Sequence, residues 1–531
     1  MQDSPLAHPE RRMGKRMMAG EAGSSESRAW WESRWLLLAL IAGCAIPLLY
    51  PPIPPLVDLL GHMGRYRVEL DLASSPWLQR YYGYRWAAIG NLGVDVLVKL
   101  LGPALGLELA VKLIVLAIPP LTAAGFLWVA REVHGRIPPT AFFALPLIYG
   151  HPFLFGFVNY TLAMALTFLA FGLWLRLGRL GRTRLRAVLF VPISVVIFFC
   201  HTYGWGALGL LCFSAEAVRQ HDKGIGWWKA GLKAVLHASV MALPVVIMLA
   251  WRSETHGGSI SGWFDWSMKL LWLTTMFRDR WQLFDLVSLA VVPFVLVVAL
   301  RDERLTFSRN LAFSAIVLIV AFAVLPWTVF GSAYADMRLV PYMMAVLLLA
   351  VRFRDRVDIR LGSVLAAAGL LFLVVRLGTT AVSLKIASDD QQAKLAALDH
   401  VPVGARVVSL VGDSCGPRWP LPRNTHLGAM TIVRRQGFSN DQWTVEGANL
   451  LSLRYRQAGV FSADASQIVH DNNCPRQDLW TIDRALRALD AHRDRFDYVW
   501  LIDPGPFDSR LIAGMRPVWR GPGSILYRIN P

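Results

Sequence analysis

The sequence predicts an α-helical polytopic membrane protein, with about eleven transmembrane helices and a C-terminal extracytoplasmic α/β domain. Of its 531 residues, 55% are hydrophobic and only 17% are charged, and the mean hydropathy is +0.42. The apolar residues fall in long blocks, and from about Gly378 the composition changes to that of a soluble domain. A single water-soluble globule does not carry so many long apolar blocks, so the first 377 residues are expected to cross a membrane repeatedly.

The strongly basic charge agrees with this class. The formal net charge is +17 and the isoelectric point is near 10, which in a soluble protein would suggest nucleic-acid binding. Here most of the excess Lys and Arg lies in short loops between apolar blocks, where it sets the orientation of membrane spans. Topology therefore explains the charge, and no nucleic acid is expected as a partner.

The predicted order of segments begins with a polar, basic cytoplasmic tail over residues 1–29, with no apolar periodicity and hence expected to be disordered. The expected spans cover 30–50, 105–129, 138–149, 154–175, 187–200, 203–218, a segment ending at Trp251, 283–300, 311–330, 339–351 and 361–377. With the tail inside, eleven spans place every strongly basic short loop on the inner face and the C-terminus outside. The protein is accordingly expected to be an integral membrane protein with its C-terminal part on the outer side. As an alternative, the segment before Cys44 is a lipoprotein signal peptide, although the tail before it is long.

The loop that follows the first span, residues 51–103, carries the most informative pattern. Asp58, His62 and Arg65 stand in a DxxxHxxR spacing, which on a helix places the three side chains on one face. A carboxylate, an imidazole and a guanidinium can together take a proton and hold a phosphate. The structural alternative is an amphipathic helix whose polar face is merely wetted. A second amphipathic segment, 85–102, brings Asp95 to the same surface.

Further polar residues gather at the expected outer ends of the spans. These are His151, Asn159, His201, Tyr203, Asp336 and Arg338. Ionisable groups are costly at partly buried span ends, so their convergence at one depth predicts a site at the outer leaflet. Each has a structural alternative: His151 and Asn159 can satisfy backbone groups freed by Pro152, and Tyr203 can belong to an aromatic belt.

The C-terminal part, 378–531, is predicted to be a small α/β domain. Its expected elements are a helix over 381–398, a strand over 405–411, a helix over 480–493, and strands over 497–503, 515–519 and 524–529. In an extracytoplasmic setting Cys415 and Cys474 are expected to form a disulfide. A metal site that combines these cysteines with His426 or His470 is an alternative, but the spacing fits no tight ligand motif.

Several short motifs resemble a known superfamily. They are YPPIPPLVDLLGHMGR, GFVNYTLAMALTFLAFGLWLR, CHTYGWGALGLL, ADMRLVPYMMAVLLLA and HLGAMTIVRRQGF. With the order of first span, large outer loop, many spans and outer C-terminal domain, they are similar to a bacterial group of the GT-C superfamily of membrane glycosyltransferases. The resemblance implies an inverting transferase that takes a sugar from a polyprenyl-phosphate donor and passes it to an extracytoplasmic lipid or glycan acceptor.

Carried onto this sequence, the resemblance makes Asp58 the general base and lets His62, Arg65 and Arg338 bind the lipid phosphate. The chain departs from part of the superfamily because Asp58 is followed by Leu59 and not by a second acid, which leaves Asp95 as an alternative base. The candidate catalytic residues are thus Asp58 and Asp95. The candidate substrate-binding residues are His62, Arg65, His151, Asn159, His201, Tyr203 and Arg338.

Two other classes of function stay open at this stage. A transporter or flippase for lipid-linked saccharides would be expected to have internal repeats and charges at mid-span; an assembly factor would act through its C-terminal domain and would tolerate the loss of Asp58. The sequence contains no Walker loop, GxSxG elbow or HExxH motif, so it names no cofactor. A divalent metal ion is left open.

Overall fold

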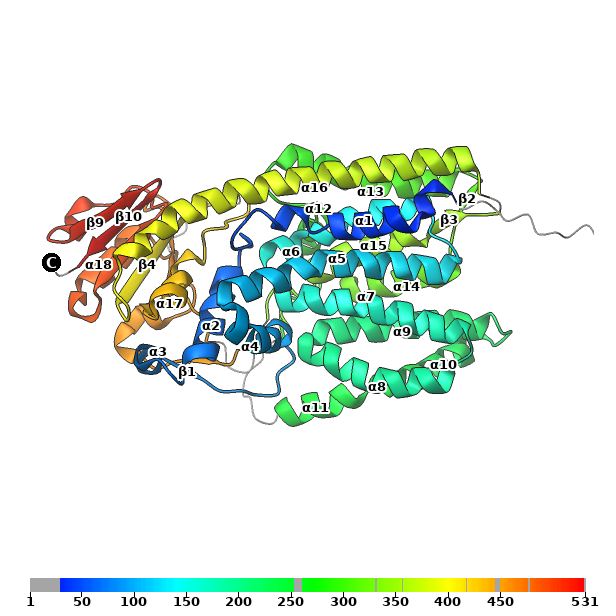
Figure 1. Ribbon diagram of the computed structural model, residues 1–531, viewed down its shortest axis with the longest axis horizontal. Helices are drawn as coiled ribbons and strands as arrows, with labels where there is room; N and C mark the ends of the chain where they lie inside the picture. The colour runs from blue at the N-terminus through cyan, green and yellow to red at the C-terminus, as the bar shows by residue number, and fades with distance from the viewer. Residues whose placement is uncertain are drawn as a thin grey trace, which may run out of the picture.

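The computed structural model describes residues 29–252, 260–329, 332–355, 357–416, 418–444, 449–475 and 478–529. The molecule is elongated, with a bundle of helices along most of its length and an α/β region at one end (Figure 1). One long helix, α16 (Ile359–Leu395), runs from the far end of the bundle into the α/β region and crosses the expected boundary at Gly378 without a break. The predicted tail lies outside the described residues, apart from Ala29.

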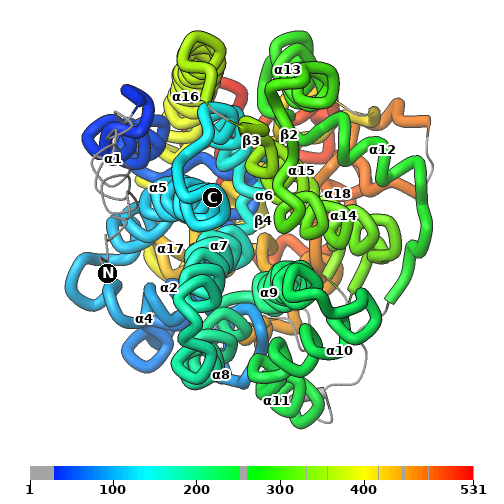
Figure 2. The backbone as a smooth tube through the Cα atoms, turned by 90° about the vertical axis from the view of Figure 1, so that its right-hand side faces the viewer, coloured from blue at the N-terminus to red at the C-terminus, as the bar shows by residue number. Residues whose placement is uncertain are grey.

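The bundle consists of α16 and ten shorter helices, which are seen end-on in Figure 2. These are α1 (Arg34–Gly43), α5 (Leu107–His134), α7 (Val158–Arg179), α8 (Thr183–Cys200), α9 (Thr202–His221), α10 (Trp227–Ala238), α11 (Leu243–Arg252), α13 (Gln282–Arg301), α14 (Arg309–Val324) and α15 (Val340–Ala350). A short sheet of β2 (Leu305–Phe307) and β3 (Val351–Phe353) lies at the end opposite the α/β region.

Five helices of the described residues are long and apolar enough to cross a membrane: α5, α7, α8, α13 and α16. The pair α10 and α11, bent by 59°, makes a sixth if it is one span. The chain is therefore a multi-pass helical protein, while the predicted count of eleven spans is not established. The segment expected as a span over 138–149 is the 3₁₀-helix η3 (Pro139–Tyr149), which contains Pro146.

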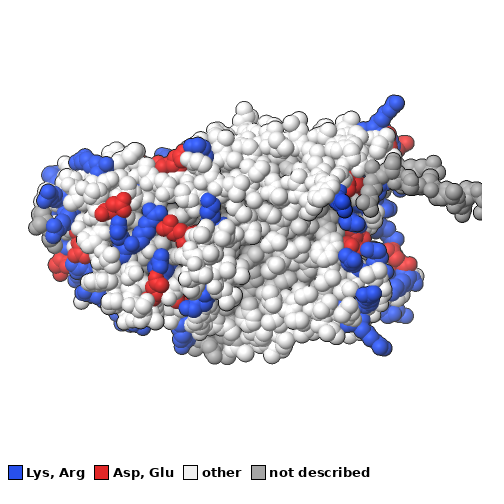
Figure 3. All heavy atoms as spheres, viewed as in Figure 1, with Lys and Arg blue, Asp and Glu red and all other residues white. Residues whose placement is uncertain are grey.

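The distribution of charge marks the part of the surface that faces lipid. On the face shown in Figure 3, Lys, Arg, Asp and Glu gather at the two ends of the molecule and leave a broad uncharged belt across the bundle. Large apolar side chains of the bundle helices are exposed, for example Leu236, Leu283 and Leu371. Such a belt is stable in hydrocarbon and not in water, so it places the bundle within a membrane.

The loop after α1 folds back between the bundle and the α/β region. It forms α2 (Leu59–Asp71), α3 (Pro76–Tyr81), β1 (Tyr82–Tyr84) and α4 (Gly93–Leu105). Strand β1 pairs antiparallel with β6 (Leu451–Leu453), and buried side chains of this loop share a hydrophobic cluster with the C-terminal sheet: Val68, Leu78, Tyr81 and Tyr82 contact a core that contains Val408, Leu410 and Phe438. The first loop is thus part of the core of the α/β region. Two further short helices are α6 (His151–Phe155) and α12 (Trp266–Thr274).

The α/β region is built on one mixed sheet in the order β5, β4, β8, β10, β9, and β7 pairs with the C-terminal part of β4 on the side opposite β8. Strand β4 (Arg406–Asp413) is parallel to β5 (Phe438–Ser439), β7 (Ile468–His470) and β8 (Tyr498–Ile502), and β10 (Ser524–Arg528) runs antiparallel between β8 and β9 (Arg516–Gly521). Helices α17 (Met430–Arg435) and α18 (Ile482–Asp490) connect strands. The six elements predicted for this region occur in the predicted order, whereas α17, β5, β6 and β7 were not predicted.

Candidate functional site

A cavity of about 310 Å³ lies where one end of the helix bundle meets the first loop and the α/β region. Its walls come from segments that are far apart in the chain: Asp58, His62, Asn91, Phe157, Val158, Asn159, Tyr160, His201, Ser332, Ala333, Tyr334, Arg338, His426, Trp443, Asn449 and Asp464. Five of the residues predicted from the sequence are among them: Asp58, His62, Asn159, His201 and Arg338. The structure therefore brings a large part of the predicted site together around one space.

Asp58 sits immediately before α2 and is fixed through its backbone. Its N–H donates to the carbonyl oxygen of Phe155 at 2.9 Å, and Gly156, at φ +100°, packs so closely that a Cβ there would lie 2.7 Å from the Asp58 nitrogen. Only glycine tolerates both conditions. The Asp58 side chain is 14% exposed, and burial raises its pKa to about 7, although His426 and Arg338 act in the opposite direction. A carboxyl group in this range can act as a general base at neutral pH.

Arg338 supplies a buried cation to the same cavity. It lies in η5 (Met337–Leu339) and is 6% exposed. Its guanidinium carbon is 4.4 Å from the ring centre of Phe157 and 5.3 Å from that of Tyr203, and Nη1 donates to Ser332 Oγ at 3.1 Å. Within the described part of the chain its Nε has no hydrogen-bond partner. A guanidinium held by aromatic rings with donors to spare is suited to an anion such as a phosphate.

Two of the three histidines on the cavity wall are His62, from the first loop, and His201, from the turn between α8 and α9. The His62 ring is 5.0 Å from the ring of Trp443; burial, assisted by Arg65 and His426, keeps the pKa of His62 well below its usual value, so His62 is neutral. His201 accepts the N–H of Tyr203 on Nδ1 at 3.2 Å. When His201 is neutral, its proton is accordingly on Nε2, and it can serve as a hydrogen-bond donor.

Arg65 and Asp95 do not line the cavity, which corrects the expectation that they face it beside Asp58. Arg65 Nε and Nη2 donate to the two carboxylate oxygens of Asp95 at 2.9 and 3.1 Å, and Nη1 donates to Asn449 Oδ1 at 2.6 Å. Asn159 Nδ2 adds a bond to Asp95 at 3.1 Å. The packing of α4 against α2 creates this arrangement, in which Asp95 is 1% exposed. The geometry thus gives the pair a structural role and makes Asp58 the better placed of the two acids.

His151 and Tyr203 are also outside the cavity lining. His151 is 2% exposed and packs beside Phe155 and Trp272, with ring centres 5.7 and 6.2 Å away. Its backbone N–H donates to the carbonyl of Met276 at 2.9 Å, and among the described residues its ring nitrogens have no hydrogen-bond partner, so the structure does not support the alternative in which this side chain satisfies backbone groups freed by Pro152. Tyr203 packs behind Arg338 and helps to hold the guanidinium.

Two residues of the α/β region complete the site and were not predicted as part of it. His426 Nε2 is 3.7 Å from Asp58 Oδ1, and His426 Nδ1 is 2.6 Å from Asp441 Oδ1. The only sequence signal for His426 was that it is the first residue of the motif HLGAMTIVRRQGF. The motif did not indicate that this histidine lies next to the first loop.

The alternative use of His426, a metal site with Cys415 and Cys474, does not fit the structure, because the two cysteines form a disulfide. In the described ranges no group of three or more His, Cys, Asp or Glu side chains is arranged to hold a metal ion.

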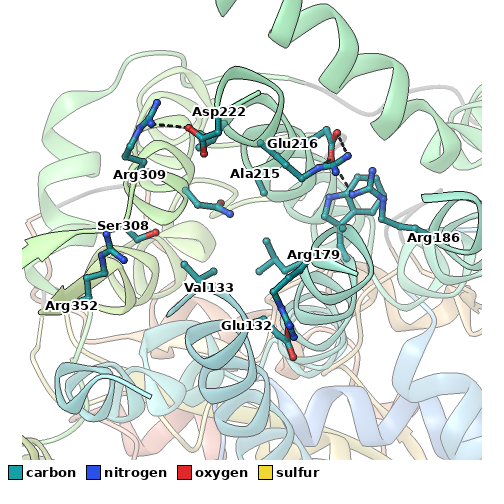
Figure 4. A pocket seen from close by; sticks show the side chains of 16 residues that line it. Glu132, Val133, Arg179, Arg186, Ala215, Glu216, Asp222, Ser308, Arg309 and Arg352 are labelled. Carbon is teal, nitrogen blue, oxygen red and sulfur yellow. Dashed lines mark hydrogen bonds and ion pairs between the residues drawn. The ribbon is translucent and has the colours of Figure 1, made fainter. Parts of the chain in front are cut away.

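A second cavity, of about 380 Å³, lies at the opposite end of the bundle among α5, α7, α8, α9 and α14 (Figure 4). Its acidic residues are all engaged by arginines: Glu132 with Arg179, Glu216 with Arg186 and Arg219, and Asp222 with Arg309. Carboxylates held in this way are poor bases. Acid–base chemistry is therefore better supported at the Asp58 cavity.

No protein-family model and no curated protein sequence matches the chain. Among solved structures it is similar to ArnT from Cupriavidus metallidurans in the apo state, with 13% identity, a TM-score of 0.46, and coverage of 93% of this chain and 98% of that chain. It is also similar to the same protein bound to undecaprenyl phosphate, with 11% identity, a TM-score of 0.43 and the same coverage.

ArnT is a GT-C superfamily glycosyltransferase, which is the superfamily that the sequence motifs resemble.

Proposed function

We propose that the chain is an inner-membrane glycosyltransferase of the GT-C type, which moves a sugar from a polyprenyl-phosphate donor to an extracytoplasmic lipid or glycan acceptor with inversion at the anomeric carbon. The observation that carries the proposal is that Asp58, a carboxyl group with a pKa of about 7, and the buried Arg338 guanidinium line the same cavity. The donor class is the one that the motif resemblance implies.

These two groups fit the two demands of a single displacement. The acceptor oxygen attacks the anomeric carbon while Asp58 takes its proton, and the bond from that carbon to the phosphate oxygen breaks. The electron pair leaves with the polyprenyl phosphate, whose added negative charge Arg338 stabilises, with His201 as a further donor. At the end of the step the proton is on Asp58 and the electron pair is on the polyprenyl phosphate.

The position of the cavity supports a lipid-linked donor. Its lining combines residues of the bundle, such as Asn159 and Arg338, with residues of the α/β region, such as His426, so a phosphate at Arg338 is compatible with a polyprenyl chain that stays in the membrane. The opposite wall, formed by the α/β region, is available to a polar acceptor.

The test uses purified protein in proteoliposomes, a panel of polyprenyl-phosphate sugars with labelled glycan groups, and lipid or glycan acceptors from the same membranes. The proposal expects label in the acceptor fraction and release of polyprenyl phosphate in equal amounts. Movement of intact donor from one leaflet to the other, with no label in any acceptor, would replace the transferase with a flippase. Absence of both transfer and movement for every donor would overturn the proposal.

A further inference from the structure

His426 lies between two carboxylates that come from different parts of the chain. Its Nδ1 is 2.6 Å from Asp441 Oδ1, within the α/β region, and its Nε2 is 3.7 Å from Asp58 Oδ1, at the start of α2. The ring is 6% exposed and packs 4.4 Å from the ring of Trp443. An imidazole enclosed in this way has little freedom to turn away from either acid.

Asp441 fixes the state of the ring. It is 1% exposed, and its second oxygen accepts the backbone N–H of Ala429 at 3.0 Å. Because a carboxylate accepts hydrogen bonds, the proton of neutral His426 is on Nδ1, directed at Asp441. The lone pair on Nε2 then faces Asp58. Gln467 approaches the same Nδ1 at 3.5 Å and adds no group that takes a proton.

The charges around the ring favour its protonated form. Burial alone would lower the pKa of His426, but Asp441, then Asp58 and Asp464, outweigh burial and raise the pKa above its usual value. The charged and titratable groups that face the ring or Asp58 are Asp58 and His62 from the first loop, Asp441 and Asp464 from the α/β region, Arg338 from η5, and Tyr334. A proton on Nε2 therefore has a stable place between two acids.

We infer that His426, held by Asp441, is the proton-relay residue of the site: it receives on Nε2 the proton that Asp58 takes from the acceptor hydroxyl. In the competent state Asp58 is ionised and His426 is neutral. After transfer, the proton moves from Asp58 to Nε2, Asp58 is a carboxylate again, and the imidazolium loses the proton to water when the product leaves. The inference rests on the proposed function, and it makes the α/β region a part of the reaction centre.

The arrangement predicts a specific change in the pH dependence of transfer. In the wild type, activity rises with pH as the Asp58–His426 pair loses its proton. In His426→Gln the last proton of the pair has only Asp58 to occupy and is lost more readily, so the rise moves to lower pH, and the maximal rate falls about 10- to 100-fold because the relay is gone. A residue that only supported the fold would lower the rate without moving the profile.

Three variants separate these outcomes. Asp441→Asn removes the group that fixes the ring and is expected to lower the rate as His426→Gln does. Asp441→Glu keeps a carboxylate and is expected to restore part of the rate. His492→Gln, a matched change at a partly exposed position outside the cavity, is expected to leave rate and profile unchanged. A lowered rate with an unmoved profile in His426→Gln would overturn the inference.

A second readout does not depend on transfer. The ¹⁵N resonances of His426 can be assigned by difference from His426→Gln and titrated in the wild type and in Asp58→Asn. The inference expects the Nε2 titration to move to lower pH when the Asp58 charge is removed; an unchanged titration overturns it. If the wild type transfers no sugar from any donor, the proposed function fails, and this titration still decides whether Asp58 and His426 share a proton.

Discussion

Replacing Asp58 by Asn should make the folded protein more stable at pH 8 but not at pH 4.5. The pKa of Asp58 is about 7 in the fold and about 3.9 in an unfolded chain. A group whose pKa is raised by folding keeps its proton in the folded state while the unfolded state loses it. Ionised Asp58 therefore costs stability, and the cost grows as pH rises from about 4 to about 7.

The size of the effect follows from the shift of about three pH units. At about 1.4 kcal/mol per unit, the full cost above pH 7 is about 4 kcal/mol. The contacts of Asp58 with His426 and Arg338 are already contained in the folded value. Asn carries no charge and avoids this cost, so the variant is expected to gain up to about 4 kcal/mol at pH 8 and less than about 1 kcal/mol at pH 4.5.

Equilibrium unfolding in mixed micelles, followed by tryptophan fluorescence, measures this difference at the two pH values. Asp71→Asn is the matched control on the same helix: its carboxylate is 31% exposed and pairs with Arg67, so its loss is expected to change stability by less than about 1 kcal/mol. An equal gain for Asp58→Asn at both pH values, or no gain at pH 8, would refute the assignment of a raised pKa to Asp58.

Three further predictions follow from the site and its supports. Arg65→Leu leaves the Asp95 carboxylate buried without its main partner and should lower the free energy of unfolding by about 3–5 kcal/mol in the same assay. Wild-type stability combined with lost donor binding would show instead that Arg65 binds the donor phosphate. Arg338→Gln should raise the KM for the lipid donor about 10- to 100-fold, and Arg338→Lys should recover part of it; an unchanged KM in both variants would contradict the phosphate role. Reduction of the Cys415–Cys474 disulfide, which closes a loop with a separation of 59 residues, should cost about 4 kcal/mol, measured as faster proteolysis of the α/β region; equal proteolysis rates would contradict this.

The elements of the fold were predictable wherever the signal is local. The apolar runs that became α5, α7 and α13 are long enough to be recognised from composition alone, and the strands β4, β8 and β10 carry the expected apolar pattern. The segment over 138–149 was harder, because its composition is apolar although its helix is a 3₁₀-helix. No local sequence pattern specifies the number of spans. None specifies that α16 continues across the expected domain boundary.

The site was predictable only in part, for a similar reason. The spacing of Asp58 and His62 predicted that they share one face, and both line the cavity. This part of the prediction needed only the local geometry of α2, because Asp58 directly precedes this helix and His62 lies in it. The same spacing placed Arg65 there as well, and the structure turns it to Asp95 because α4 packs against that side of α2. Helical periodicity specifies which residues share a face but not which neighbour covers the end of that face.

His426 shows the limit most clearly. It is separated from Asp58 by most of the bundle in sequence, and the two meet because the first loop joins the core of the α/β region through β1 and β6. A single sequence contains no periodicity that reports such a long-range contact, so the second half of the site had to come from the fold.

The most direct measurement of the central claim is the rate of labelled sugar transfer from a polyprenyl-phosphate donor by purified wild type, Asp58→Asn and Asp71→Asn in proteoliposomes at pH 7.5. The account predicts that Asp58→Asn folds at least as well as the wild type and transfers about 10²- to 10⁴-fold more slowly, while Asp71→Asn transfers at the wild-type rate. Transfer by Asp58→Asn at the wild-type rate would show that another group removes the acceptor proton and would contradict the account.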